Sequence, residues 1–331
     1  MQIGYFLSCE EHGPRSLIDQ AKAAEQAGFD ALWISDHFHP WNDEQGESPF
    51  VWSVIGAIAA ATPLRVSTFV TCPTMRIHPA IVAQAAATSS LLLDGRFELG
   101  IGTGEHLNEH ILGDPWPLHE ERLAMLEESV ELMRALWTGE EVTHRGDHYL
   151  VEAARLYSVP DAPPPVAVSA FGPKATDLAA RIGDGFVSTS PAGDLLSRYR
   201  EQGGTGPASA GVKVCWGADR DACMRTAHRL WRSSGVPGEL SQDLRLPALF
   251  DQASELVSPE ALAEKVPCGP EVEPIVEAVR AYVDAGFDRI YVNQIGPDQR
   301  GFFRFLDTEL RPALEDLGIT TTSEQVLAGA S

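Results

Sequence analysis

Short runs of apolar and β-branched residues alternate along the chain with longer amphipathic stretches, a pattern typical of repeated βα units. Eight runs predict strands, at residues 2–8, 30–35, 65–71, 97–102, 166–170, 186–190, 211–216 and 289–294. Helical stretches between them include residues 15–27, 80–93, 120–137, 174–182 and 272–285. This order predicts an α/β fold, a (β/α)8 TIM barrel, with a doubly wound open sheet as the competing architecture.

Two stretches interrupt the rhythm and predict insertions. Residues 143–158 predict a hairpin, which a proline-rich run at 160–165 leads back into the barrel. Residues 233–265 are polar and poorly periodic, which predicts a long loop with short helices over the barrel mouth, where such insertions often cover substrates. Residues 1–317 therefore form one predicted barrel domain, and the Thr/Ser/Ala-rich residues 318–331 predict a frayed tail.

Composition narrows the function classes. The 331 residues include 25 basic and 47 acidic side chains, a formal net charge of −22 that repels nucleic acids and anionic membranes. Five widely spaced cysteines without a Cys-x-x-Cys pair indicate neither a disulfide framework nor a thiolate zinc site. The first residues lack a basic and apolar leader, so we expect a cytoplasmic enzyme that acts on small molecules.

Candidate chemistry lies at the carboxyl ends of the predicted strands, because the reactive groups of βα barrels are found there. The first four strands end near titratable or aromatic side chains, namely Glu10, Asp36, His37, Trp41, Thr71 and Glu105. The fifth and sixth strands end instead at Phe171-Gly172 and Thr189-Ser190, which offer backbone and hydroxyl donors. This asymmetry predicts a site with an acid/base half and a ligand-anchoring half.

Each candidate also has a plain structural interpretation. His37 can act as a general base held by Asp36, or the pair can be a helix N-cap and a packing residue. The glycines at 100, 102 and 104 permit close approach of a flat ligand and deliver Glu105 beside it. They do not make a G-x-G-x-x-G dinucleotide fingerprint, because Glu105 occupies the position of its third glycine. The alternative is a tight turn with a solvated carboxylate.

The segment 106–110 reads His-Leu-Asn-Glu-His and matches the H-x-x-E-H form of a zinc-peptidase class. That mechanism needs both histidines on one face of a sustained helix. Glycines precede the segment, and Gly113-Asp114-Pro115 follows it, which leaves room for barely two turns. We therefore expect no metal site.

Taken together, these motifs make the chain resemble the bacterial-luciferase-like superfamily, and within it the oxidoreductases that depend on the deazaflavin coenzyme F420, typified by the F420-dependent glucose-6-phosphate dehydrogenases. The resemblance spans residues 4–314 and is weakest over 197–262. Its specific motifs are residues 35–41 (SDHFHPW), 102–109 (GTGEHLNE), 183–186 (GDGF) and 298–300 (DQR). It implies coenzyme F420 as cofactor, with FMN less favoured, a homodimer, and hydride transfer.

The resemblance also implies catalytic roles. His37 would remove the proton of an alcohol or hemiacetal as hydride leaves the adjacent carbon. Glu105 would protonate N1 of the deazaflavin, which requires a carboxyl whose pKa is raised by burial. Trp41 would pack over the substrate side of His37 and exclude water, and Glu10 would hydrogen-bond the substrate or hold the histidine.

Eleven residues correspond to cofactor-contacting positions of the family. They are Asp36, Phe69, Val70, Thr71, Thr103, Gly104, Asn108, Phe171, Gly172, Lys174 and Ala175. The Phe69-Val70 pair matches a cis peptide bond that family members carry after the third strand. Phe171 departs from the family, since a glycine is expected at that position.

The substrate positions depart further. The family's dehydrogenases hold a sugar phosphate with two lysines and an arginine, and the matching positions here are Ala192, Ser241 and Lys265, with Thr189 nearby. Each lost charge-assisted contact weakens binding by about 1.5–3 kcal/mol. Arg198, Arg200 and Arg245 are the alternative cations. We therefore expect glucose 6-phosphate to be a poor substrate, and an alcohol, lactol or unsaturated small molecule to be preferred.

Three other functions stay open at this point. A sugar-phosphate dehydrogenase with a rearranged phosphate site uses the same proton chemistry. An FMN-dependent monooxygenase differs in its reaction with oxygen, which a reduced flavin performs and a reduced deazaflavin performs poorly. A catalytically silent ligand-binding barrel would be unaffected by replacing His37 with alanine.

Overall fold

The computed structural model describes residues 1–319, so all but two residues of the predicted tail lie outside the described part. Eight parallel strands close into a barrel in the order β1-β10-β9-β8-β7-β4-β3-β2. They are β1 (Gln2–Leu7), β2 (Ala31–Ile34), β3 (Arg65–Thr68), β4 (Phe97–Ile101), β7 (Val166–Ser169), β8 (Gly185–Ser188), β9 (Ala208–Val214) and β10 (Arg289–Gln294). The closed order confirms the predicted barrel and excludes the open sheet.

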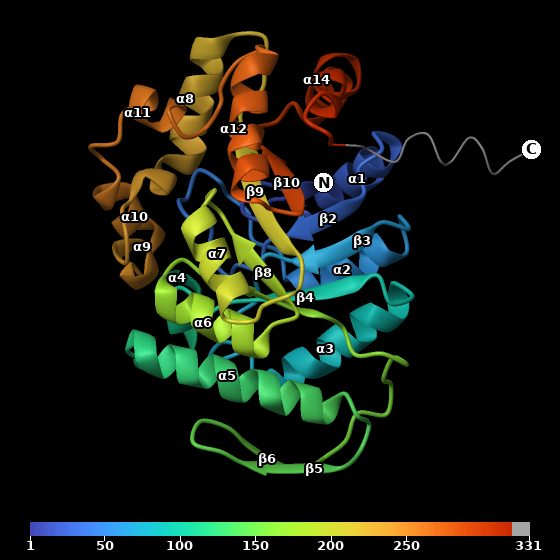
Figure 1. Cartoon of the computed structure of the whole chain (residues 1–331). Coiled ribbons are helices and arrows are strands. Elements are labelled where there is room, and N and C mark those ends of the chain that lie inside the picture. The colour runs from blue at the N-terminus through green and yellow to red at the C-terminus, as the bar shows by residue number, and fades with distance from the viewer. Residues whose placement is uncertain (320–331) are drawn as a thin grey trace, which may run out of the picture.

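Helices surround the strands (Figure 1). The longer ones are α1 (Pro14–Gln26), α2 (Val51–Ala59), α3 (Pro79–Leu92), α5 (His119–Leu136), α6 (Pro173–Ile182), α7 (Gly193–Glu201), α8 (Arg220–Trp231) and α12 (Val272–Ala285). The last strand leads into α13 (Gln299–Phe305), a π-helical turn (Leu306–Leu310) and α14 (Arg311–Glu315). Prolines in the first turn of α1, α3 and α6 suit a position where no backbone donor is needed. No helix within residues 1–319 is long and apolar enough to cross a membrane.

The two predicted insertions contain regular structure. The first holds an antiparallel hairpin of β5 (Val142–Arg145) and β6 (Leu150–Ala154), which projects below α5 in Figure 1. The second holds a short helical turn (Arg232–Gly235) and the helices α9 (Leu240–Asp243), α10 (Pro247–Ala253) and α11 (Pro259–Ala263). The α9 helix packs against α4 (His106–Glu109), which begins directly after β4, so this insertion lies at the carboxyl ends of the strands.

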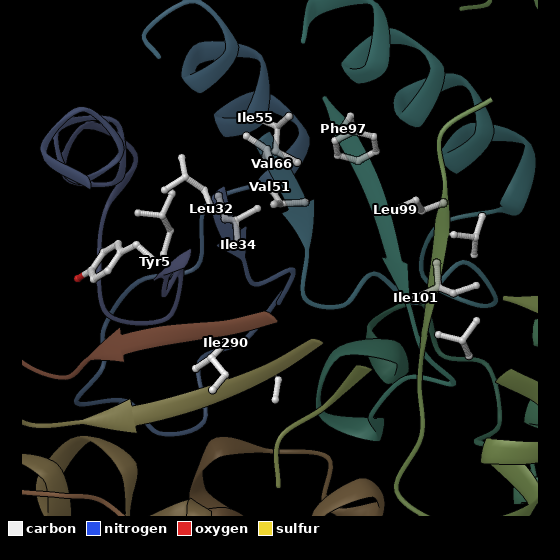
Figure 2. Close-up of a cluster of buried hydrophobic side chains, with 14 of the residues drawn as sticks. Tyr5, Leu32, Ile34, Val51, Ile55, Val66, Phe97, Leu99, Ile101 and Ile290 are labelled. Atoms are coloured by element: carbon white, nitrogen blue, oxygen red, sulfur yellow. The ribbon is translucent and has the colours of Figure 1, made fainter. Parts of the chain in front are cut away.

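The outer core fills the space between strands and helices. Figure 2 shows Val51 and Ile55 of α2 beside Ile34 and Val66 of the neighbouring strands, and all four are fully buried. Burying each such side chain contributes about 1.5–3 kcal/mol. This layer fixes the helices that follow the strands and therefore the loops between them.

The inner core is aromatic. Trp33 stacks between Phe69 and Tyr291, with ring centroids 4.1 and 4.0 Å apart. Gly4 makes room for this stack, since a Cβ there would lie 2.3 Å from the Tyr291 ring. Because side chains alternate along a strand, Ser35 is the next inward residue of this strand path after Trp33. The stack therefore fills the barrel one layer below the strand ends.

Candidate functional site

Three strand ends bring Glu10, His37 and Glu105 together. The Nε2 atom of His37 lies 3.5 Å from Oε1 of Glu10 and 3.5 Å from Oε2 of Glu105. On the other side of the ring, Nδ1 lies 3.1 Å from the carbonyl oxygen of His39. A proton on Nδ1 is held by that carbonyl, which leaves the lone pair of Nε2 facing the two carboxyl groups. This arrangement suits a histidine that exchanges a proton through Nε2.

Two serine hydroxyls hold the carboxyl group of Glu10. Its side chain is only 2% exposed, and Oε2 accepts hydrogen bonds from the hydroxyls of Ser8 at 2.8 Å and Ser35 at 2.7 Å. Donors aimed at an ionised carboxylate stabilise its charge. The two serines thus fix one oxygen and leave the other directed at His37.

Glu105 has the opposite character. Although 31% of its side chain is accessible, protein atoms surround the carboxyl group, and this burial raises its pKa, with a further contribution from Glu10. His37, Lys213 and a 3.2 Å hydrogen bond from Asn108 act against that shift. The expectation of a carboxyl with a raised pKa is confirmed. Glu105 can therefore keep its proton above the ordinary range of a carboxyl group.

Asp36 belongs to a separate, closed set of contacts. Thr71 donates to one of its oxygens and Arg76 to the other, both at 2.8 Å. The backbone N–H of Arg76 also donates to Glu109 at 2.8 Å, and its Nε lies 3.7 Å from the same carboxyl group. Burial raises the pKa of Glu109 to about 7, against the effect of Arg76. No helix begins at Asp36, since residues 35–37 are irregular, so the helix-cap interpretation is wrong.

Asn108 connects this region to the loop after β2. Its side-chain oxygen accepts from the backbone N–H groups of Phe38 at 2.9 Å and His39 at 3.2 Å, while its amide nitrogen donates to Glu105. It is therefore positioned to fix the loop that carries His37. The sequence predicted Asn108 as a cofactor contact, and the structure adds this positioning role.

Trp41 lies beside His37, with ring centroids 5.0 Å apart, as the resemblance implied. Its other side meets Phe250 edge-on at 5.1 Å. Phe250 is fully buried and comes from α10, inside the insertion predicted to cover the barrel mouth. The insertion thus supports the aromatic wall beside His37.

The H-x-x-E-H segment does not form a zinc site. His106 and Glu109 belong to a four-residue helix, and the Nδ1 atoms of His106 and His110 lie 3.0 and 2.8 Å from backbone carbonyl oxygens. Glu109 turns inward to Arg76. Across residues 1–319, no group of three or more His, Cys, Asp or Glu side chains could hold a metal ion.

The other predicted cofactor positions follow β3, β4 and β7. The Phe69–Val70 peptide bond is cis, as the resemblance implied. Gly172 precedes the ten-residue helix α6 without a side-chain cap, and no atom would approach a Cβ there within 4 Å. Phe171 is 54% exposed beside it, while Lys174 forms a surface ion pair with Glu120 at 2.6 Å. Ala175 packs on the core, and Thr103 and Gly104 precede Glu105.

Of the four predicted substrate positions, only Lys265 has a charged side chain. Ala192 has no polar side chain, Thr189 and Lys265 are exposed, and the hydroxyl of Ser241 donates to the carbonyl of Gly238 at 3.0 Å. The structure records no contact between any of these four side chains and His37 within residues 1–319.

Two of the alternative cations are engaged elsewhere. Arg198 donates two hydrogen bonds of 2.6 Å to Asp177. Arg200 bonds Asp288 at 3.2 Å and the carbonyl of Gly206 at 2.6 Å. Neither guanidinium is free to replace the missing phosphate contacts without breaking these bonds.

Sequence reasoning missed two charged residues, Lys213 and Arg76. Lys213 lies on β9, two residues after Gly211, whose Cα faces Trp33 inside the barrel, so Lys213 also points inward. Burial lowers its pKa, whereas neighbouring carboxyl groups, Glu10 foremost, raise it. The available signal was a lysine flanked by two buried valines on a barrel strand. The valines pack toward the helices, so the alternation of side chains directs the lysine into the barrel.

Comparison with known proteins places the chain among redox enzymes. The family model of luciferase-like monooxygenases matches residues 1–289. The F420-dependent glucose-6-phosphate dehydrogenase of Nocardia farcinica (strain IFM 10152) is 35% identical over 333 residues, which covers 96% of this chain and 99% of that protein. The enzyme of the same name from Nakamurella multipartita (strain ATCC 700099 / DSM 44233 / CIP 104796 / JCM 9543 / NBRC 105858 / Y-104) is 36% identical, covering 96% of this chain and 97% of that protein.

A solved structure is similar over nearly the whole length. An F420-dependent secondary alcohol dehydrogenase in complex with an F420-acetone adduct superposes with a TM-score of 0.87 at 30% identity, covering 95% of this chain and 98% of that one. The F420-dependent tetrahydromethanopterin reductase from Methanopyrus kandleri has the same fold, with a TM-score of 0.72 at 19% identity, covering 94% and 99% of the two chains.

Proposed function

Since the chain belongs to the luciferase-like monooxygenase family, we propose that it is an oxidoreductase that exchanges hydride between coenzyme F420 and a small alcohol, lactol or unsaturated substrate. The observation that carries the proposal is the position of His37 between Glu10 and Glu105. Glu10 accepts hydrogen bonds from two serines and Glu105 has a raised pKa, so the site offers acceptors for a proton beside an acid.

The residues present fit coenzyme F420. The N-terminus of α6 presents uncapped backbone N–H groups beside the open space at Gly172, which suits the phosphate of the cofactor tail. A carboxyl group that retains its proton, Glu105, suits a ring nitrogen that gains negative charge. The residues that would hold the cofactor are Asp36, Phe69, Val70, Thr71, Thr103, Gly104, Asn108, Phe171, Gly172, Lys174 and Ala175. When bound, F420 supplies the two-electron hydride chemistry.

The chain's own groups would handle the protons. His37 takes the proton of the substrate hydroxyl through Nε2, and Glu10 stabilises the resulting imidazolium at 3.5 Å. Trp41 packs beside the His37 ring and helps to keep water away. Glu105, which lies 3.5 Å from the same Nε2 atom, keeps its own proton available for the cofactor.

Glucose 6-phosphate should be a poor substrate. A phosphate bound near Ala192 and Ser241 would meet no cation from those two positions, and Arg198 is bound to Asp177. Losing contacts of about 1.5–3 kcal/mol each lowers affinity by orders of magnitude. Turnover of glucose 6-phosphate at micromolar KM would contradict this part of the proposal.

A titration of the purified protein with F420 and with FMN, followed by absorbance and fluorescence, tests the cofactor. We expect saturable binding of F420 and much weaker binding of FMN. Tight FMN binding without F420 binding would overturn the proposal. Slow reaction of the F420-loaded, reduced protein with oxygen would further separate it from a flavin monooxygenase.

A homodimer in the cytoplasm completes the proposal. Ile81, Leu91 and Leu92 on α3 are 43–56% exposed, and apolar side chains gathered on one helix favour a protein contact. Sedimentation of the purified chain at twice its monomer mass is the expected result, and sedimentation as a monomer would contradict it.

A further inference from the structure

Lys213 lies deep in the site without a protein acceptor. Its Nζ atom stands 4.6 Å from the ring centroid of Trp231, a cation–π contact that covers one side of the ammonium group. Within residues 1–319, no hydrogen bond or ion pair joins this ammonium to the protein. An ammonium group has three donors, and a buried one is costly when they are unmet. The missing acceptors must come from water or from a ligand.

The carboxyl groups near Lys213 are already engaged. Glu10 uses one oxygen for the two serines and points the other toward His37. Glu11 accepts from Trp231 at 2.5 Å and from the backbone N–H of Gly296 at 2.9 Å. Lys213 therefore feels their charge without donating to them, and its donors stay available.

Acidic groups outnumber cations in this part of the site, since Glu10, Glu11 and Glu105 all act on the single ammonium group of Lys213. Burial raises the pKa of Glu11 to about 7 and also raises the pKa of Glu105, so burial favours the neutral form of both groups. An anionic substrate would leave a net negative charge in a place shielded from water, which is costly, whereas an uncharged oxygen would not.

We propose that Lys213 is a substrate-binding residue that donates a hydrogen bond to an oxygen atom of an uncharged substrate, so that the site selects alcohols and polyols over carboxylates and phosphates of similar size. The inference rests on the proposed oxidoreductase function and adds the substrate class. Lys213 reaches the substrate from β9, which ends at the same face of the barrel as the strands that carry Glu10, His37 and Glu105.

The first experiment replaces Lys213 with methionine, which keeps the length of the side chain and removes its charge. With propylene glycol as substrate, kcat/KM should fall about 10- to 100-fold, since hydrogen bonds to charged groups contribute about 1.5–3 kcal/mol. F420 affinity should stay within about twofold, and Lys213→Arg should recover part of the loss. Lys22→Met is the matched control, because Lys22 lines a groove of about 1060 Å³ between α1 and α13, outside the site.

Two results would overturn the proposal. One is a Lys213→Met protein whose kcat/KM stays within about threefold of the parent; the other is an equal loss in F420 affinity, which would make Lys213 a cofactor residue. If circular dichroism shows that the variant does not fold, a binding measurement on the parent protein still tests the proposed selectivity. Calorimetry of the F420-loaded protein should then show propylene glycol binding at least about tenfold more tightly than lactate, which has a carboxylate in place of one hydroxymethyl group.

Tighter binding of lactate than of propylene glycol, or no binding of either compound, would contradict the proposed role of Lys213. These outcomes differ from a failure of the proposed function, because that failure would appear as absent F420 binding. F420 binding with a preference for lactate would leave the oxidoreductase in place and reject only the role of Lys213.

Discussion

Two groups of charged side chains share the mouth of this barrel and are built in opposite ways. In the paired network of Asp36, Arg76 and Glu109, direct hydrogen bonds of 2.8 Å link the arginine to both acids. In the relay cluster of Glu10, His37, Glu105 and Lys213, the acids lie 3.5 Å from the histidine and the lysine has no acceptor.

The difference in spacing between the two groups indicates that the first has a structural role and the second a chemical one. Ion pairs and hydrogen bonds within the protein hold the paired network together, so its main effect is to fix the backbone after β2, β3 and β4, while Asp36 keeps its predicted place in the cofactor site. Loosely spaced groups with unmet donors or lone pairs cost stability and can exchange protons with a substrate. We therefore expect substitutions in the first group to lower stability and substitutions in the second to lower activity.

The largest effect should follow from Arg76→Met. The substitution leaves Asp36 and Glu109 buried without their cation, and breaking a buried pair in this way costs about 3–5 kcal/mol. Urea unfolding of the parent and the variant measures the loss. Arg145→Met is the control, because its ion pair with Glu152 is solvent-exposed and should contribute little. A loss below about 1 kcal/mol would show that the paired network is not a structural element.

His37→Gln should change activity instead. Without a base at Nε2, kcat should fall about 100- to 1,000-fold, while the free energy of unfolding changes by less than about 1 kcal/mol. Steady-state kinetics with an uncharged alcohol and urea unfolding measure the two effects. His144→Gln serves as the control, since His144 of the hairpin binds Glu128 of α5, away from the site. Equal activity of the parent and His37→Gln proteins would favour a catalytically silent barrel.

Most of the fold could be predicted from the sequence, because strand and helix periods survive in the chain. The largest difference at the start of a strand is at β9, predicted at 211–216 and observed at Ala208–Val214. Its first residues, Ala208-Ser209-Ala210-Gly211, are small and lack the β-branched side chains that indicate a strand. Gly211 faces the barrel interior, where it leaves room for Trp33, and periodicity alone does not reveal that contact.

The site was predictable where barrel topology alone decides the placement. Glu10, His37 and Glu105 follow strands whose ends must converge, so a correct barrel brings them together. Arg76 and Lys213 escaped prediction for a different reason. The direction of a charged side chain depends on strand register and on partners far away in the sequence, such as the Trp231 ring beside Lys213. The remaining cofactor and substrate residues stay predictions.

The smallest expected effect concerns the pH dependence of Glu105→Gln. Burial raises the pKa of Glu105, so its acid form persists above the ordinary range of a carboxyl group and is lost as the pH rises through that raised value. The rate of F420 reduction by an uncharged alcohol should therefore decline at high pH in the parent. Glutamine cannot titrate, so the variant should lose this decline and react about tenfold more slowly at its best pH. Glu152→Gln, on the exposed hairpin, should keep the parent profile. Stopped-flow measurements across pH decide the point, since an unchanged high-pH decline in Glu105→Gln would move the acid role to another member of the relay cluster.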